Sequence, residues 1–328
     1  MKKFFKRREA SILVLLLVLM VVFSFSSDQF LTLTNFKDCL KSSSLKIILA
    51  AGMSIVLITG GIDMSLVATA GMTQMIFGRL MAYAGWGPVP TILVTVLLGI
   101  LFGSVNGLLI SKGRIAPIVA TLGVASVVKG MMYVYMDLSG SSSLWINSNE
   151  LPGWFLSFGT IKVMGIPIQI IIAALIVLLT YWMMHFTIIG RCVYAIGGNK
   201  NAAERIGINV DLITIFVYAY FGFILSIGVF ADTAGIALCD PNSYNGIDFE
   251  VVAAVVVGGV TMVGGFGSII GGVLGALFMV FLSNGLGLIR VSTYWQKVIV
   301  GIVIIIAVSV EAAKRLYNER HAQTIDVM

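Results

Sequence analysis

The feature that most constrains this chain is a succession of ten apolar windows separated by short polar segments. A helix of about 20 residues crosses the roughly 30 Å hydrocarbon core of a bilayer. Lipid offers no partner for backbone N–H and C=O groups, so segments of this length cross it as helices. The sequence therefore predicts an all-α polytopic membrane protein with about ten transmembrane helices, in windows 10–25, 45–60, 62–83, 89–111, 116–135, 166–186, 211–233, 250–263, 268–288 and 294–312.

The composition agrees with this class of protein. Hydrophobic residues make up 59% of the chain and charged residues only 11%, whereas soluble domains carry about 25% charged residues. We expect residues 1–328 to form a single transmembrane domain. The formal net charge of +6 does not indicate nucleic-acid binding, because the basic residues gather at the ends of the apolar windows.

The distribution of basic residues predicts the orientation. An even number of spans places both termini on one side, which we expect to be cytoplasmic by the positive-inside rule. The tails 1–9 and 313–328 would then be cytoplasmic, and segments 26–44, 136–165 and 234–249 would lie outside. The thirteen Lys and Arg residues on the cytoplasmic side are Lys2, Lys3, Lys6, Arg7, Arg8, Lys112, Arg114, Arg191, Lys200, Arg205, Lys314, Arg315 and Arg320.

A polar stretch at about 190–210 interrupts the apolar windows on this cytoplasmic side. Within it, Asn201 is placed to cap a short helix over 202–206, and Gly207 is placed to end that helix. Such a short charged helix is suited to a groove on another protein. An ordinary solvated loop that only enforces topology is the alternative.

Glycines recur every four residues in two of the windows. Gly99, Gly103 and Gly107 follow one helix face, as do Gly267, Gly271 and Gly275, and each row favours close helix packing. The two windows are five apart and cross in opposite directions, which fits two inverted five-helix halves. The tripeptide Gly-Ile-Asp at 61–63 recurs at 246–248 in the matching position.

Several strings resemble, in order, the permease subunit of bacterial ABC importers for simple sugars, the ribose-type family. The strings are Gly60-Gly61-Ile62-Asp63-Met64-Ser65, Asn106-Gly107-Leu108-Leu109-Ile110, Ala120-Thr121-Leu122-Gly123, the 190–210 stretch with Ala202-Ala203-Glu204-Arg205-Ile206-Gly207, and 258–267. The resemblance as a whole covers roughly residues 44–312. The family usually has small residues with a glycine after the serine of the first string, whereas Leu66-Val67-Ala68 follows Ser65 here. This departure leaves the sugar open.

The resemblance implies a transport subunit in a bacterial plasma membrane. Its expected partners are two ATP-binding subunits, a second identical or homologous permease subunit, and an extracytoplasmic binding protein that delivers a monosaccharide or related sugar. The 190–210 stretch would be the coupling loop that docks on the ATPase. Its expected contact residues are Arg191, Ala202, Glu204, Arg205 and Gly207.

Polar side chains in or beside the windows are the candidates for a translocation path, because unpaired polar groups are costly in lipid. Hydroxyls and amides suit a sugar. Hydrogen bonding between helices, typically worth about 0.6 kcal/mol per pair, is the structural alternative, and Asp63 is also placed to cap a helix. The candidates are Asp63, Ser65, Gln74, Asn106, Thr121 and Asn284.

The sequence contains no combination of residues that is typical of an enzyme active site. The two histidines, His185 and His321, lie in different settings, and Gly264-Gly265-Phe266-Gly267 lacks the Lys-Ser or Lys-Thr of a P-loop. We therefore expect no catalytic residue, metal or cofactor, and ATP hydrolysis on a separate subunit. An ion-coupled secondary transporter of a small polar solute is the alternative, and it would place an acidic or histidine relay at mid-membrane.

Overall fold

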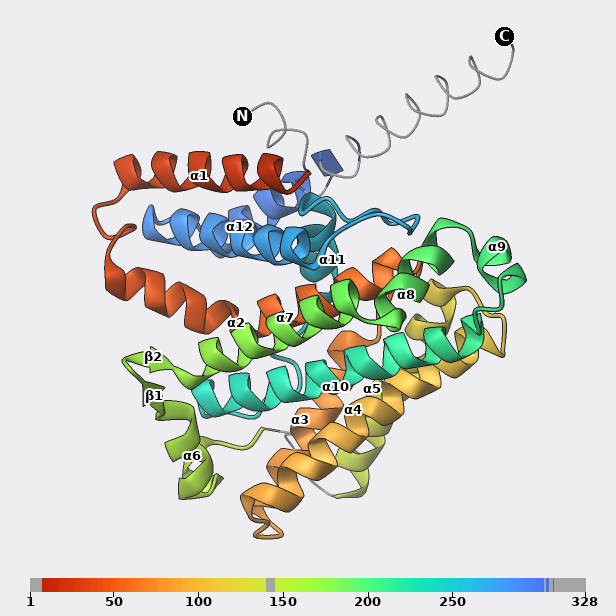
Figure 1. The fold of residues 1–328 in the computed structure, drawn as a ribbon. Helices are drawn as coiled ribbons and strands as arrows, with labels where there is room; N and C mark the ends of the chain where they lie inside the picture. Colours follow the sequence, from red (N-terminus) through yellow and green to blue (C-terminus); the bar gives the residue numbers. More distant parts are fainter. Residues whose placement is uncertain (1–7, 140–144, 304, 307–308, 310–328) are drawn as a thin grey trace.

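The computed structural model describes residues 8–139, 145–303, 305, 306 and 309, and these are almost entirely helical (Figure 1). The long helices are α1 (Arg8–Ser26), α2 (Leu33–Ile58), α3 (Leu66–Ala82), α4 (Pro88–Ser111), α5 (Pro117–Leu138), α7 (Ile168–Phe186), α10 (Val210–Ile236) and α12 (Ile269–Leu288). The shorter elements are η1 (Ser148–Glu150), α6 (Gly153–Thr160), β1 (Lys162–Val163), β2 (Ile166–Pro167), α8 (Ile188–Gly198), α9 (Lys200–Arg205) and α11 (Ile247–Val257).

The all-α polytopic fold is confirmed. Each of the ten apolar windows contains helix, although window 62–83 becomes helical only at Leu66 and window 250–263 is helical only to Val257. In the last window residues 293–303 are helical. Among the described residues, six helices are long and apolar enough to cross a membrane, namely α2, α4, α5, α7, α10 and α12. The number of spans stays a prediction. The predicted tail 313–328, and residues 1–7 of the predicted tail 1–9, lie outside the described residues.

Helix α2 differs from its prediction. We expected segment 26–44 to be an external loop, but the helix begins at Leu33, where the Thr32 hydroxyl accepts a hydrogen bond from the Asn35 N–H at 3.2 Å. The polar residues that suggested a loop are accommodated inside the helix. The Ser44 hydroxyl, for example, donates to the Leu40 carbonyl at 2.8 Å, one turn earlier.

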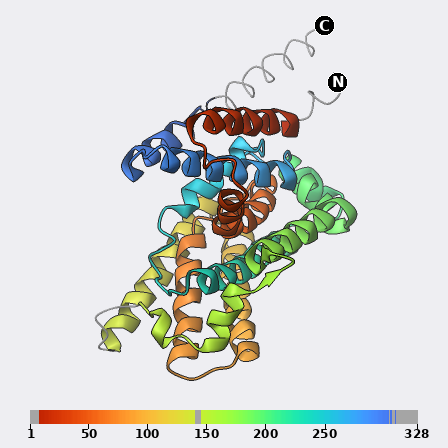
Figure 2. The same cartoon turned by 90° about the vertical axis from the view of Figure 1, so that its left-hand side faces the viewer.

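The described helices form layers around α2. Helices α1, α12, α2, α10 and α4 succeed one another across the bundle, and each contacts the next (Figures 1 and 2). In α2, 78% of the most apolar 18-residue stretch is buried. This helix is the centre of the main hydrophobic core.

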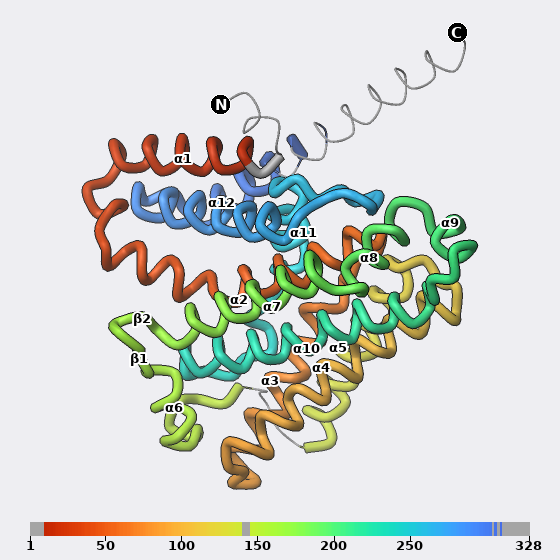
Figure 3. The backbone as a smooth tube through the Cα atoms, viewed as in Figure 1, coloured from red at the N-terminus to blue at the C-terminus, as the bar shows by residue number. Residues whose placement is uncertain are grey.

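The two ends of the bundle carry different elements. Helices α8 and α9 lie at one end, and α6 with the antiparallel pair β1–β2 lies at the other (Figure 1). The chain leaves α7, passes through α8 and α9, and returns along α10 (Figure 3). The loop after α4 reaches the same end, where the Arg114 guanidinium is 3.8 Å from the Asp211 carboxylate at the start of α10.

Glycines allow the closest helix approaches. A methyl group added at Gly99 or Gly103 of α4 would overlap with the backbone of α10, and one added at Gly107 would meet Ile215 of α10. A methyl added at Gly271 or Gly275 of α12 would overlap with α11, whereas Gly267 precedes α12 and packs on Val260. Close approach requires glycine at the helix-contact positions.

Candidate functional site

The polar stretch 190–210 folds as two consecutive helices. Asn199 caps α9, since its side-chain oxygen accepts a hydrogen bond from the Ala202 N–H at 3.0 Å. The prediction that Asn201 is the cap is therefore wrong; the helix begins at Lys200, two residues earlier than predicted. Gly207 follows the end of α9 with φ +87°, a left-handed conformation that glycine adopts without strain.

The outer face of α9 is open to solvent. Ala203 is buried with Ile196 and Val210, which fixes α9 against α8 and the start of α10. The Ile206 side chain is 76% exposed. The five residues predicted to contact an ATPase, Arg191, Ala202, Glu204, Arg205 and Gly207, are all exposed. A small apolar surface with charged neighbours thus extends from the end of the bundle.

Sequence reasoning missed α8. Thr187 caps it by accepting a hydrogen bond from the Gly190 N–H at 3.5 Å. Gly190, Val193 and Ile196 are its buried residues, and this spacing of three is the signal of a helix with one packed face. The stretch resembles a loop because Arg191 and three glycines interrupt its apolar residues.

Asp63 is the centre of a buried polar cluster at the joint between α2 and α3. Its carboxylate accepts hydrogen bonds from the Ser65 N–H at 2.8 Å, the Ser65 hydroxyl at 2.6 Å and the Asn106 amide at 3.3 Å. The Asn106 amide also donates to the Ser65 hydroxyl at 2.7 Å. Asp63, Ser65 and Asn106 are each at most 4% exposed.

Two further contacts attach this joint to α5 and α10. The Met64 N–H donates to the Thr121 hydroxyl at 3.1 Å, and the Tyr218 hydroxyl donates to the Ile62 carbonyl at 3.1 Å. Four of the six predicted path residues, Asp63, Ser65, Asn106 and Thr121, therefore meet at one place. They tie the joint to α4 and α5. The Asn106 side-chain oxygen is the one buried oxygen of these four side chains without a hydrogen-bond partner.

Gln74 lies apart from the Asp63 cluster, halfway along α3. Its amide donates to the Thr233 hydroxyl at 2.9 Å and the Tyr244 hydroxyl at 3.2 Å. Its side-chain oxygen is buried without a hydrogen-bond partner, as is the neighbouring Thr73 hydroxyl. Tyr244 also reaches Asp232 at 3.5 Å. This second cluster connects α3, α10 and the segment before α11.

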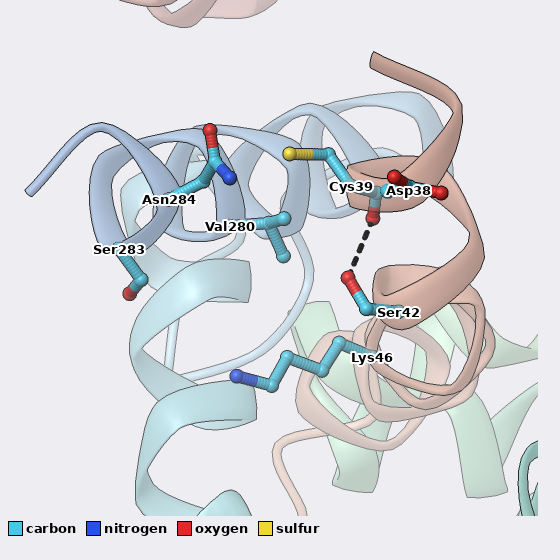
Figure 4. Close-up of a pocket in the computed structure, with 7 residues that line it drawn as sticks. All are labelled: Asp38, Cys39, Ser42, Lys46, Val280, Ser283 and Asn284. Carbon is cyan, nitrogen blue, oxygen red and sulfur yellow. Dashed lines mark hydrogen bonds between the residues drawn. The ribbon is translucent and has the colours of Figure 1, made fainter. Parts of the chain in front are cut away.

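Asn284 lies in a third place, at a cavity of about 450 Å³ between α2 and α12 (Figure 4). Its amide exchanges hydrogen bonds with the Asn35 amide at 3.0 and 3.1 Å. The Lys46 ammonium, which also lines the cavity, is 2.7 Å from the Glu250 carboxylate. The lining residues are Asp38, Cys39, Ser42, Lys46, Val280, Ser283 and Asn284.

The residues that the structure describes contain no group of three or more potential metal ligands. Cys39, Cys192 and Cys239 are free thiols. Lys129, the cation of window 116–135, forms no ion pair with Asp232 within the described part of the chain.

Comparisons with known proteins place the chain in a family. A family model described as the branched-chain amino acid transport system permease component matches residues 35–308. The ribose import permease proteins RbsC of Escherichia coli and Bacillus subtilis are both 33% identical to it. The first alignment covers 94% of each chain and the second 91% of each.

The galactose/methyl galactoside import permease protein MglC of Escherichia coli is 30% identical, over 94% of this chain and 95% of the relative. No solved structure shows a significant match. The resemblance seen in the sequence strings is thereby confirmed over nearly the whole length. The chain is a member of this family of transport-system permease components.

Proposed function

We propose that this chain is the permease subunit of an ATP-driven importer and forms the translocation path for a monosaccharide or related sugar. The observation that carries the proposal is the capped helix α9, which presents Ala202, Glu204 and Arg205 to solvent at one end of the bundle. ATP hydrolysis would take place on two partner subunits that dock there. The three relatives named above are import permease proteins, which favours this function over an ion-coupled transporter.

The orientation follows from the same end of the bundle. Arg114, Arg191, Lys200 and Arg205 lie with α8 and α9, so the positive-inside rule makes this end cytoplasmic. Both termini would be cytoplasmic and the protein would reside in a bacterial inner membrane. The opposite end, with α6 and the β1–β2 pair, would receive the extracytoplasmic binding protein.

The substrate class rests on the relatives and on the polar groups in the bundle. The description of the family model names branched-chain amino acids as the transported class, whereas the names of the relatives refer to ribose and to galactose or methyl galactoside. The Asp63 carboxylate is already hydrogen-bonded to Ser65 and Asn106, and the buried side-chain oxygens of Asn106 and Gln74 that lack a partner belong to neutral amides. These groups match the hydroxyls of an uncharged sugar better than the two charges of an amino acid. A second permease subunit, identical or homologous, would complete the path.

Uptake into proteoliposomes tests this function. The complex is extracted gently from its own cells, reconstituted with its accompanying subunits and binding protein, and supplied with radiolabelled ribose, galactose or leucine. We expect accumulation of a sugar that requires ATP. ATP-dependent uptake of leucine alone would make the substrate an amino acid. Uptake driven by an ion gradient in the absence of ATP would contradict the proposal.

A further inference from the structure

Three segments distant in sequence meet backbone to backbone behind α8. They are the end of α8 at Gly197, the end of α2 at Ile58, and the loop between α11 and α12 at 264–265. The Gly265 N–H donates to the Ile58 carbonyl at 2.8 Å. A methyl group added at Gly197 would overlap with both of these groups. No side chain separates the three segments at this point.

The loop between α11 and α12 has a second attachment to α8. The Tyr194 hydroxyl donates to the Gly267 carbonyl at 2.9 Å. A methyl added at Gly264 would be 2.8 Å from the Gly60 nitrogen and 3.0 Å from the Gly197 carbonyl oxygen. Helix α8 is therefore held directly against the start of the α2–α3 joint and against the loop that precedes α12.

These contacts continue to the buried polar cluster. The joint that begins after Ile58 contains Asp63, which is bonded to Asn106 of α4, and Met64, which is bonded to Thr121 of α5. Backbone groups in contact have no rotamers to absorb a displacement, and closely packed interiors transmit strain. A movement of α8 must therefore displace the joint and the 264–267 loop together.

We propose that Gly197 and Tyr194 are positioning residues that transmit movement of the docked ATPase to the polar groups of the translocation path. This inference rests on the proposed function, because it requires an ATPase at α8 and α9. The inference adds to the proposed function because it assigns the transmission of this movement to two residues that lie outside the exposed contact surface. Gly197 transmits through direct backbone contact, and Tyr194 through its hydrogen bond to the loop before α12.

The chain offers a matched control at the neighbouring position. A methyl added at Gly198 meets no atom within 4 Å, whereas one added at Gly197 overlaps with two backbone segments. Gly197→Ala, Gly198→Ala and Tyr194→Phe are prepared as the full complex. Three quantities are measured on each: the amount of ATPase subunit that co-purifies, sugar uptake in proteoliposomes, and the number of ATP molecules hydrolysed per sugar.

We expect Gly197→Ala to keep ATPase capture within twofold of wild type while uptake falls at least tenfold and ATP consumption per sugar rises. Tyr194→Phe, which removes one hydrogen bond and adds no bulk, should lower uptake two- to fivefold with capture unchanged. Gly198→Ala should match wild type in all three measurements. Because Tyr194→Phe creates no overlap, it tests the inference even where Gly197→Ala fails to fold.

Three results would overturn the inference. In the first, Tyr194→Phe keeps the uptake and the ATP consumption per sugar of the wild type, and Gly197→Ala behaves like Gly198→Ala. This result would show that α8 transmits no movement through these contacts. Loss of ATPase capture in step with uptake would show that the two residues build the docking surface instead. Failure of the wild-type protein to capture any ATPase would overturn the proposed function, and the inference with it.

Discussion

The tripeptide Gly-Ile-Asp occurs at 61–63 and again at 246–248, in matching positions of the two predicted halves, yet its two copies have different environments. Asp63 lies in non-helical backbone before α3, is 4% exposed and is hydrogen-bonded to Ser65 and Asn106. Asp248 lies in the first turn of α11 and is partly exposed, and its Oδ1 atom has no hydrogen-bond partner. The first joint is thus a closed buried cluster, and the second is an ordinary helix start.

The close helix contacts of α4 and of α12 are much more alike. Gly99 of α4 packs on Ser226 of α10, and Gly272 of α12 packs on Ser54 of α2. In both cases the serine hydroxyl donates to the carbonyl one turn earlier in its own helix, at 2.8 Å for Ser226 and 2.6 Å for Ser54. This agreement fits the predicted inverted halves, which stay a prediction. The comparison teaches that packing is similar in the two halves while the chemistry of the joints differs.

The largest contrast is expected between the two aspartates. Asp63→Ala removes the acceptor of three buried donor groups and should lower the free energy of unfolding by about 3 kcal/mol. Asp248→Ala removes only a carboxylate at a helix start, where its interaction with the helix dipole is worth under about 1 kcal/mol. Unfolding in a denaturing-detergent titration measures both. Equal losses would contradict the difference between the joints.

A smaller effect is expected at both glycine contacts. Gly99→Ala and Gly272→Ala each force a methyl group onto a facing serine, and at Gly99 the methyl also overlaps with the Gly222 carbonyl. Each substitution should lower the free energy of unfolding by about 2 kcal/mol. Gly123→Ala on α5 is the control, because a methyl there meets no atom within 4 Å. The melting temperatures of the purified variants in mild detergent measure these losses of stability. If the melting temperature falls in only one of the two glycine variants, the similar geometry of the two contacts does not give them similar contributions to stability.

The sequence predicted the fold class and the position of every long helix, because apolar length is a local property. It also placed a short helix before Gly207. It failed where polar residues lie within helices. The early start of α2 depends on serine hydroxyls bonded inside the helix, and α8 depends on one narrow buried face.

Local sequence patterns could not predict which polar side chains lie together in the folded protein. Asp63, Asn106 and Thr121 stand in separate family-like strings, and only the packing of α3, α4 and α5 brings them together. Gln74 and Asn284, predicted on the same grounds, lie in two other places. Residue type alone does not distinguish these three environments.

Docking of an ATPase on α9 is the central claim, and a capture experiment tests it most directly. The protein is extracted gently from its own membranes as wild type, as Glu204→Lys, and as Lys162→Glu. The last variant reverses an exposed charge on β1 at the opposite end of the bundle. We expect an ATP-binding subunit to co-purify with wild type and Lys162→Glu, and its amount to fall at least fivefold with Glu204→Lys. Capture that is equal in all three proteins, or absent from wild type, would show that no ATPase docks on α9.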